Sequence, residues 1–237
     1  MRQILNEWRQ YLKEEEEEKR KVNIFLDMDG VLVDFPSALK EYIKSIYSVD
    51  PHVLHPGSKS SRRVLGRLQS MNLSPSEIDE LYDGTEHKFQ SGAEYEPDEK
   101  IMGDYIFKAL LGNKDLWLAM NQLEGADTLV AEVFDLADEV FVLTAQVDEV
   151  SKEAKKEWIG NYFPQIKAAN VYVDREKGER LRQLIKSGTV AETDLNILID
   201  DRRKFLDDFI DAGGVGIQYD FQSSDVTFEE LKAIIPN

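Results

Sequence analysis

Two pairs of acidic residues in this sequence stand directly after short apolar runs. They are Asp27 and Asp29 after Val22–Leu26, and Asp200 and Asp201 after 196–199. Carboxylates that meet in one cleft cannot all be ionised without a compensating cation. Oxygen ligands without histidine or cysteine favour Mg²⁺ over zinc. If the fold brings both pairs together, they can hold a magnesium ion.

Two further apolar runs also end in polar residues. Thr144 follows the run 139–143, and the run 171–173 leads into Asp174 and then Lys177. A phosphoryl group is bound well by a combination of a divalent cation, a lysine, a threonine hydroxyl and a helix N-terminus. An aspartate carboxylate can attack phosphorus in such a site. We therefore expect phosphoryl chemistry, subject to the fold.

The pattern of apolar runs predicts strands that alternate with helices. The expected strands are 22–26, 139–143, 171–173, 196–199 and 215–219, and the expected helices between and after them are 125–137, 149–162, 178–186, 204–212 and 227–235. Strands separated by helices indicate an α/β fold, a Rossmann-like parallel sheet with right-handed crossovers and helices on both faces. Ligands bind such sheets at the carboxyl ends of the strands. All four polar strand ends would then converge.

The remaining segments predict two additions to this core. Residues 36–116 have helical, irregular patterning, and we expect a small helical cap inserted after the first strand. Ser74 to Glu77 has the pattern of a capping box at a helix start. Residues 1–21 predict a charged N-terminal helix. The predicted catalytic core is 22–35 together with 117–237.

Composition restricts the partners. The net charge is −17, which disfavours binding to polynucleotides or anionic membranes but allows a small phosphorylated substrate. There is no cysteine, and the three histidines lack metal-ligand spacing. No apolar run approaches the length of a membrane span, and no secretory signal is evident, so we expect a cytoplasmic protein. The sequence does not indicate an oligomeric state.

The motifs resemble those of the haloacid dehalogenase (HAD) superfamily. The run 25–32, Phe-Leu-Asp-Met-Asp-Gly-Val-Leu, is similar to its first motif; 142–145, Val-Leu-Thr-Ala, to its second; and 197–202, Ile-Leu-Ile-Asp-Asp-Arg, to its fourth. Within the superfamily, the first motif with Asp34 and Phe35 looks most like the 5′(3′)-deoxyribonucleotidase branch. The stretches 122–126, 156–159, 161–163 and 173–177 support that branch. The resemblance covers 22–35 and 123–219.

The resemblance implies a role for each matching residue. Asp27 would be the nucleophile and a Mg²⁺ ligand. Asp29 would act as acid and then as base, and its carbonyl would bind the metal. Thr144 would hold a phosphoryl oxygen, and Lys177 would neutralise the charge on the nucleophile and the transferring phosphate. The resemblance also implies that Asp200 is a metal ligand. Asp201 would bind a water molecule on the metal or would orient Lys177.

Three features depart from the nucleotidase branch. Ala145 stands where that branch often has a serine, which removes one phosphate donor. The stretch between Lys177 and Asp200 is longer than usual, so Lys186 is an alternative for the lysine role. The insert 36–116 matches poorly, and substrate choice would depend on it.

Plainer interpretations compete with these. Asp27 and Asp29 alone are compatible with a turn and a helix cap, whereas an EF-hand is excluded because a strand precedes them. Phe35, Trp117 and Tyr105 could stack on a base, but aromatic residues in a helical insert more often pack in a core. The alternatives to a nucleotidase are a phosphatase for sugar phosphates or other metabolites and a non-catalytic phosphate-binding scaffold. A polynucleotide end-phosphatase would need a basic groove, which this acidic sequence does not indicate.

Overall fold

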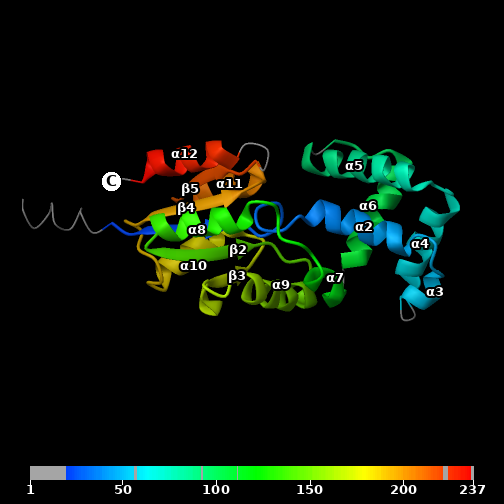
Figure 1. Ribbon diagram of the computed structural model, residues 1–237, viewed down its shortest axis with the longest axis horizontal. Coiled ribbons are helices and arrows are strands. Elements are labelled where there is room, and N and C mark those ends of the chain that lie inside the picture. Colours follow the sequence, from blue (N-terminus) through cyan, green and yellow to red (C-terminus); the bar gives the residue numbers. More distant parts are fainter. Residues whose placement is uncertain (1–19, 56–57, 92, 111, 221–223, 236–237) are drawn as a thin grey trace, which may run out of the picture. The chain divides into compact units, whose positions relative to one another are not determined.

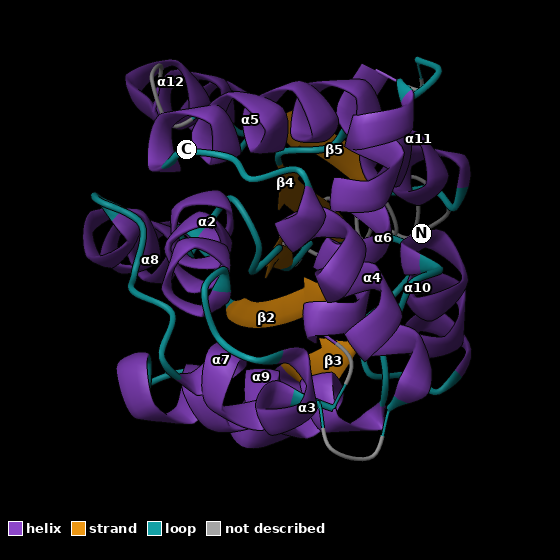
Figure 2. Cartoon of the chain, turned by 90° about the vertical axis from the view of Figure 1, so that its right-hand side faces the viewer, coloured by secondary structure: helices purple, strands orange, loops and turns teal. Residues whose placement is uncertain are grey.

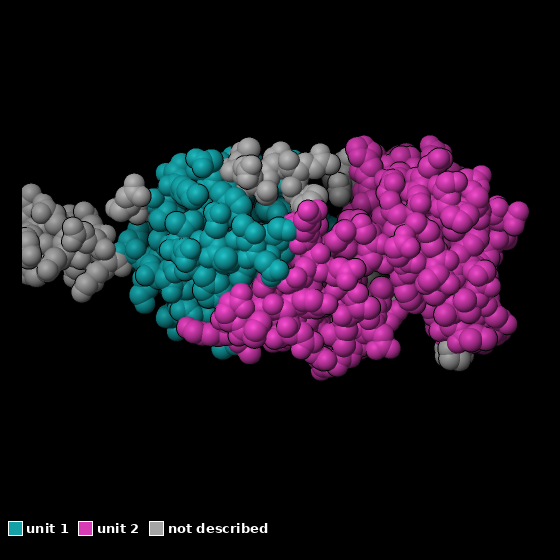
Figure 3. Space-filling model, viewed as in Figure 1, with its two compact units in different colours: residues 1–31, 125–145, 169–237 teal, residues 32–124, 146–168 magenta. Residues whose placement is uncertain are grey.

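The computed structural model describes residues 20–55, 58–91, 93–110, 112–220 and 224–235. The expected helix over 1–21 lies outside these residues except for its last two positions. Contacts within the chain group it into two units (Figure 3). Unit 1 comprises 1–31, 125–145 and 169–237, and unit 2 comprises 32–124 and 146–168. The boundaries predicted for the core and the cap remain a prediction.

Unit 1 contains a 5-stranded sheet in which every neighbouring pair is parallel. The strands are β1 (Val22–Leu26), β2 (Glu139–Thr144), β3 (Val171–Val173), β4 (Leu195–Asp200) and β5 (Val215–Gln218). Their order is β3-β2-β1-β4-β5. The chain moves outward from β1 to β3 and then returns to the other side of β1. The direction of winding therefore reverses between β1 and β4. This position is the switch point of the sheet, and such sheets bind ligands there.

The sheet forms because its central strands are apolar on both faces. Every residue of β1 is buried, and Phe25 is level with Phe141 on one side and Leu198 on the other. The rings of Phe25 and Phe141 stack with centroids 4.6 Å apart. Such near-continuous apolar strands are typical of parallel sheets covered on both faces. This confirms the predicted α/β class with a parallel sheet.

Among the residues that the structure describes, four α-helices of unit 1 accompany the sheet (Figure 1). They are α8 (Ala126–Leu136), α10 (Lys177–Lys186), α11 (Arg203–Asp211) and α12 (Ser224–Ile234). Leu181 of α10 and Phe209 of α11 pack in one cluster with Phe25. The segment with α8 leads outward from β1, whereas those with α10 and α11 lead the other way. Right-handed crossovers therefore place α8 on the opposite face from α10 and α11.

The described residues of unit 2 form helices and loops, with one isolated β-bridge between Val33 and Gln122. Its helices are α2 (Phe35–Ile46), α3 (Pro51–Leu54), α4 (Lys59–Ser70), α5 (Pro75–Ser91), α6 (Pro97–Leu110), α7 (Lys114–Leu118) and α9 (Glu149–Tyr162). The strands labelled in Figure 2 all belong to unit 1. Helix α6 packs against α4 and α5, and α7 packs against α9. No helix among the described residues is long and apolar enough to cross a membrane.

Helix α5 begins where the capping box predicts. Glu77 N–H donates to Ser74 Oγ at 3.4 Å, and Ser74 N–H donates to the Glu77 carboxylate at 2.7 Å. Proline occupies the first helical position. Three helices of the insert were not predicted individually from the sequence: α3, α4 and α7. Helices α3 and α7 have 4 and 5 residues, too few to show a helical period. Helix α4 has 12 residues, but few of them are apolar and buried.

Candidate active site

Asp27 and Asp200 meet at the carboxyl edge of the sheet, on the two strands between which the winding reverses. The N–H of Asp27 donates to Ile199 O at 2.9 Å, which continues the pairing of β1 with β4 by one residue. Lys177, the first residue of α10, donates through Nζ to Asp27 Oδ1 at 2.6 Å and also to Asp200 Oδ2. The lysine side chain is completely buried. One cation thus joins two carboxylates from neighbouring strands.

Asp201 completes a cluster of carboxylates. One oxygen from each of Asp27, Asp200 and Asp201 lies within 4.8 Å of the others. Asp201 Oδ1 is buried and has no hydrogen-bond partner among the described residues. Three carboxylates at this spacing, one of which has an oxygen without a hydrogen-bond partner, fit a hard divalent cation with oxygen ligands.

The turn after Asp27 fits closely against Asp201. Gly30 has φ +81°, a conformation that L side chains rarely adopt. A Cβ on Gly30 would lie 2.7 Å from Asp201 Oδ2. Asp29 is close enough that its charge contributes to raising the pKa of Asp201. The glycine therefore lets the segment 27–30 bring two acidic residues against a third.

Thr144 lies at the same edge of the sheet, at the end of β2. Leu26 is level with Val142, so Thr144 is two residues further toward the carboxyl edge on the strand next to β1. The threonine is buried, and its carbonyl accepts from Asp174 N–H at 2.7 Å. The ends of β2 and β3 are thereby joined beside the carboxylate cluster.

Burial and mutual repulsion shape the charges of this site. Burial, followed by the charge of Asp27, raises the pKa of Asp200 to about 6 and that of Asp201 to about 8. Burial alone would lower the pKa of Lys177, but Asp27 and Asp200 outweigh it, so the pKa is raised and the ammonium stays charged. Lys177 contacts Asp27 and Asp200, and the charge of Arg202 partly offsets the rise in the pKa of Asp201. These two cations face four carboxylates, those of Asp27, Asp29, Asp200 and Asp201. An additional cation would stabilise the ionised cluster.

Lys186 is not part of this cluster. It is the last residue of α10 and is exposed, whereas Lys177 begins the same helix and is buried. Of the two lysines considered from the sequence, Lys177 is therefore the one that contacts Asp27 and Asp200.

Three residues near Lys177 escaped sequence analysis. Gly178 N–H donates to Asp208 Oδ2 at 2.7 Å, and the Lys177 ammonium lies 4.9 Å from the centre of the Phe205 ring. Glycine is a poor helix former, so its place directly after Lys177 at a helix start was an available signal. The partners on α11 gave no local signal, because only the packing of α11 on α10 brings them near.

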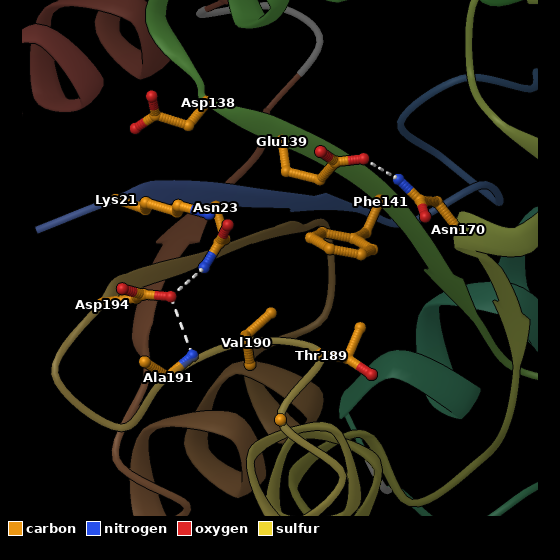
Figure 4. Close-up of a pocket in the computed structure, with 11 residues that line it drawn as sticks. Lys21, Asn23, Asp138, Glu139, Phe141, Asn170, Thr189, Val190, Ala191 and Asp194 are labelled. Atoms are coloured by element: carbon orange, nitrogen blue, oxygen red, sulfur yellow. Dashed lines mark hydrogen bonds between the residues drawn. The ribbon is translucent and has the colours of Figure 1, made fainter.

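A hollow of about 610 Å³ lies at the opposite edge of the sheet (Figure 4). Several of its polar side chains form hydrogen bonds at the starts of the strands. Asn23 Nδ2 donates to Asp194 Oδ2 at 3.1 Å and to Asn196 Oδ1 at 3.0 Å. Asn170 Nδ2 donates to Glu139 Oε1 at 2.6 Å. These contacts stabilise the amino-terminal ends of the strands and leave the carboxyl edge as the candidate site.

Comparison with known proteins gives matches among solved structures alone, since no family model and no curated protein matches the sequence. A hydrolase from Streptococcus pneumoniae TIGR4 is 16% identical, with 91% of this chain and 100% of that chain covered and a TM-score of 0.46. A haloacid dehalogenase-like family hydrolase from Xanthomonas campestris is 15% identical, with 91% and 94% covered and a TM-score of 0.46.

A third similar structure is a HAD family enzyme from Bacteroides thetaiotaomicron in complex with magnesium and inorganic phosphate. It is 12% identical, with 84% of this chain and 94% of that chain covered and a TM-score of 0.41. All three likenesses are remote. The strands and side chains of this chain themselves define the site, which is a buried carboxylate–lysine cluster at the switch point of a parallel sheet in an α/β unit.

Proposed function

We propose that this protein is a Mg²⁺-dependent phosphomonoester hydrolase of the HAD superfamily that forms a phospho-aspartate on Asp27. The observation that carries the proposal is the buried bridge from Lys177 to Asp27 and Asp200 at the switch point of the sheet. The motif resemblance of 25–32 and 197–202 supports it, as do the magnesium and phosphate of the Bacteroides enzyme.

The residues present fit a magnesium ion. Asp27, Asp200 and Asp201 would hold it, together with the backbone carbonyl of Asp29. The spacing of the three carboxylates, the unsatisfied Asp201 Oδ1 and the raised pKa values of Asp200 and Asp201 support this assignment. Bound there, Mg²⁺ would neutralise charge on the transferring phosphoryl group and align it with the nucleophile.

In the first half of the reaction, a carboxylate oxygen of Asp27 attacks phosphorus. The P–O bond to the leaving group breaks, and the Asp29 carboxylic acid donates its proton to the departing oxygen. The products are the free alcohol and an acyl phosphate on Asp27. Lys177 and Thr144 would stabilise the negative charge on the phosphoryl oxygens during transfer.

In the second half, Asp29 reverses its role. Its carboxylate takes a proton from a water molecule as the water oxygen attacks phosphorus. The bond between phosphorus and the Asp27 oxygen breaks, which restores the Asp27 carboxylate and releases inorganic phosphate. Asp29 is then protonated for the next cycle, so protons and bonds balance over the two steps.

The proposed substrates are nucleoside monophosphates, including deoxynucleotides. The inserted helices of 36–116 are proposed to select among these substrates. Support comes from the resemblance of Asp34, Phe35 and the stretches 156–159, 161–163 and 173–177 to the nucleotidase branch. Among the aromatic candidates, Trp117 and Tyr105 are completely buried, whereas Phe35 is partly exposed and stacks on Trp117 with centroids 5.6 Å apart. Phe35 is therefore the residue with a ring surface available to a base.

The test is phosphate release from a panel of nucleoside monophosphates, deoxynucleotides and sugar phosphates, with Mg²⁺ or with EDTA. Asp27→Asn removes the nucleophile, and Asp207→Asn is the matched control on an exposed aspartate of α11. We expect Mg²⁺-dependent release that Asp27→Asn abolishes and Asp207→Asn retains. Preference for sugar phosphates would overturn the nucleotidase assignment. Folded protein that binds phosphate but releases none from any ester would favour the scaffold.

A further inference from the structure

The helix that carries Lys177 is capped by another helix. The N-cap residue of α10, Glu176, makes no side-chain hydrogen bond to the helix start. Asp208 of α11 takes that place, because its Oδ2 accepts from Gly178 N–H at 2.7 Å. An anionic acceptor at a helix N-terminus satisfies a free N–H and interacts favourably with the helix dipole. The start of α10 is thus fixed from α11.

The two helices approach so closely here that a side chain would not fit. A Cβ on Gly178 would lie 2.2 Å from the backbone oxygen of Asp208 and 2.8 Å from its Oδ1. Real Cβ atoms essentially never approach other atoms this closely, and a backbone oxygen has little freedom to move away. Glycine at this position therefore allows backbone-to-backbone contact one residue after Lys177.

Helix α11 also contacts the head group of the lysine. The Lys177 ammonium lies 4.9 Å from the centre of the Phe205 ring, a distance at which the ring attracts a cation. Phe205 and Asp208 are three residues apart, so both lie on the face of α11 toward α10. Helix α11 thus contacts Lys177 at two levels. Asp208 fixes the backbone at the next residue, Gly178, and the Phe205 ring lies beside the Lys177 ammonium.

We propose that Asp208 and Phe205 are positioning residues that set where the Lys177 ammonium lies relative to Asp27 and Asp200. The inference rests on the proposed function for its catalytic meaning but not for its geometry. The position of α11 in the sequence also supports the positioning role. Helix α11 begins at Arg203, and its N-cap residue Arg202 directly follows Asp200 and Asp201. The segment that supplies two carboxylates thus also holds the lysine that pairs with one of them.

The first test is kinetic and uses substitutions at three positions of α11. Asp208→Ala removes the acceptor, Asp208→Asn keeps a neutral one of the same shape, and Phe205→Leu removes the ring. The control is Asp207→Ala, which alters an exposed aspartate paired with Arg203 at 2.8 Å. We expect Asp208→Ala to lower kcat about 10-fold to 100-fold with little change in KM, as for other residues that orient a catalytic group. Asp208→Asn should retain most of the kcat of the native protein.

The second test needs no turnover. A buried, ion-paired lysine ammonium exchanges its protons slowly, so Lys177 should give a ¹H–¹⁵N signal that Lys177→Met removes. We expect Asp208→Ala and Phe205→Leu to shift or broaden that signal and Asp207→Ala to leave it unchanged. Should Asp208→Ala fail to fold, Asp208→Asn and Phe205→Leu decide the matter by the same two measurements.

The outcomes separate this inference from the proposed function. If the native protein hydrolyses no ester but the lysine signal responds as expected, the positioning role stands and the function fails. If the native protein hydrolyses phosphate esters while neither kcat nor the signal responds to changes at Asp208 and Phe205, the positioning role is wrong and the function stands. A response of equal size in Asp207→Ala would also overturn the positioning role.

Discussion

Lys177 is the residue whose removal should affect both stability and activity. Its ammonium is the positive group bonded to Asp27 and Asp200, and all three side chains are buried. Removing one partner of a buried ion pair leaves uncompensated charge and costs about 3–5 kcal/mol. We expect Lys177→Met to lower the free energy of unfolding by about that amount without metal, and to abolish phosphate release.

The control for this variant lies on the same helix. Lys186 is exposed at the far end of α10, so Lys186→Met should change the free energy of unfolding by less than about 0.5 kcal/mol. Urea unfolding and phosphate release measure both variants. Equal losses in the two variants would contradict the assignment of the lysine role to Lys177.

Asp201 should make stability depend on pH in a recognisable direction. Burial and the charge of Asp27 raise its pKa from 3.8 to about 8, so between these values the folded state binds more protons than the unfolded state. Stability at this site is therefore lost as pH rises toward 8. In EDTA, we expect Asp201→Asn to have a higher Tm than the native protein, and the difference to grow from pH 6 to pH 9.

Magnesium should reverse that difference, because the native carboxylate gains a cation partner that the amide lacks. Thermal melts of both proteins in EDTA and in Mg²⁺ at each pH make the comparison. A Tm difference that is constant across the pH range would show that Asp201 does not titrate there, and the account of its charge would be wrong.

Gly30 has both a left-handed backbone conformation and a close contact with Asp201, whereas Gly213 has only the left-handed conformation. Gly30→Ala places a side chain at φ +81° and 2.7 Å from Asp201 Oδ2, whereas Gly213, at φ +95°, has open space around it. The left-handed conformation alone costs about 1–2 kcal/mol. We expect Gly213→Ala to show only that cost, and Gly30→Ala to lose more stability and to weaken Mg²⁺ binding. Calorimetry with Mg²⁺ distinguishes them, and equal Mg²⁺ affinity would contradict a role for Gly30 in placing Asp201.

At the scale of elements, the strands were predictable because each is an apolar run ended by polar residues. The sequence predicted β1 and β3 with their observed bounds, and β2, β4 and β5 to within a residue at either end. Gly178 could be recognised from the sequence as unusual, because glycine is a poor helix former and this one stands at the start of a predicted helix. Its contact with Asp208 could not, because 30 residues separate the two and only helix packing brings them together. Local patterns thus predict elements and strand ends, but not which helix faces meet.

Helix α9 offers a prediction at this scale. Its N-cap residue, Asp148, accepts from Ser151 N–H at 2.7 Å in a capping box, and its other oxygen accepts from Gly112 N–H at 2.7 Å. One carboxylate therefore caps the helix and ties a distant loop of unit 2 to it. We expect Asp148→Ala to cost about 1–2 kcal/mol in unfolding free energy, and Asp148→Asn to cost less. Denaturant unfolding measures both, and equal stability of Asp148→Ala and the native protein would exclude the cap.

At the scale of the whole molecule, the net charge of −17 predicts two separable responses to salt. Dissolved ions screen repulsion among surface charges, so NaCl should raise Tm gradually without saturating at a site. A bound ion should instead stabilise by saturable mass action, about 2.7 kcal/mol at 100 times its Kd. We therefore expect MgCl₂ to raise Tm more than NaCl of equal ionic strength.

The excess stabilisation by MgCl₂ should disappear when the carboxylate cluster is altered. Asp27→Asn, Asp201→Asn and the exposed control Asp207→Asn each remove one ionisable carboxyl group. At pH 9, above the pKa of about 8 of Asp201, each substitution removes one negative charge, so all three variants should respond alike to NaCl. Only the first two remove a carboxylate from the group whose oxygens lie within 4.8 Å of one another. If all three variants kept the excess, magnesium would act through the overall acidic charge, and the cluster at the switch point would not be its site.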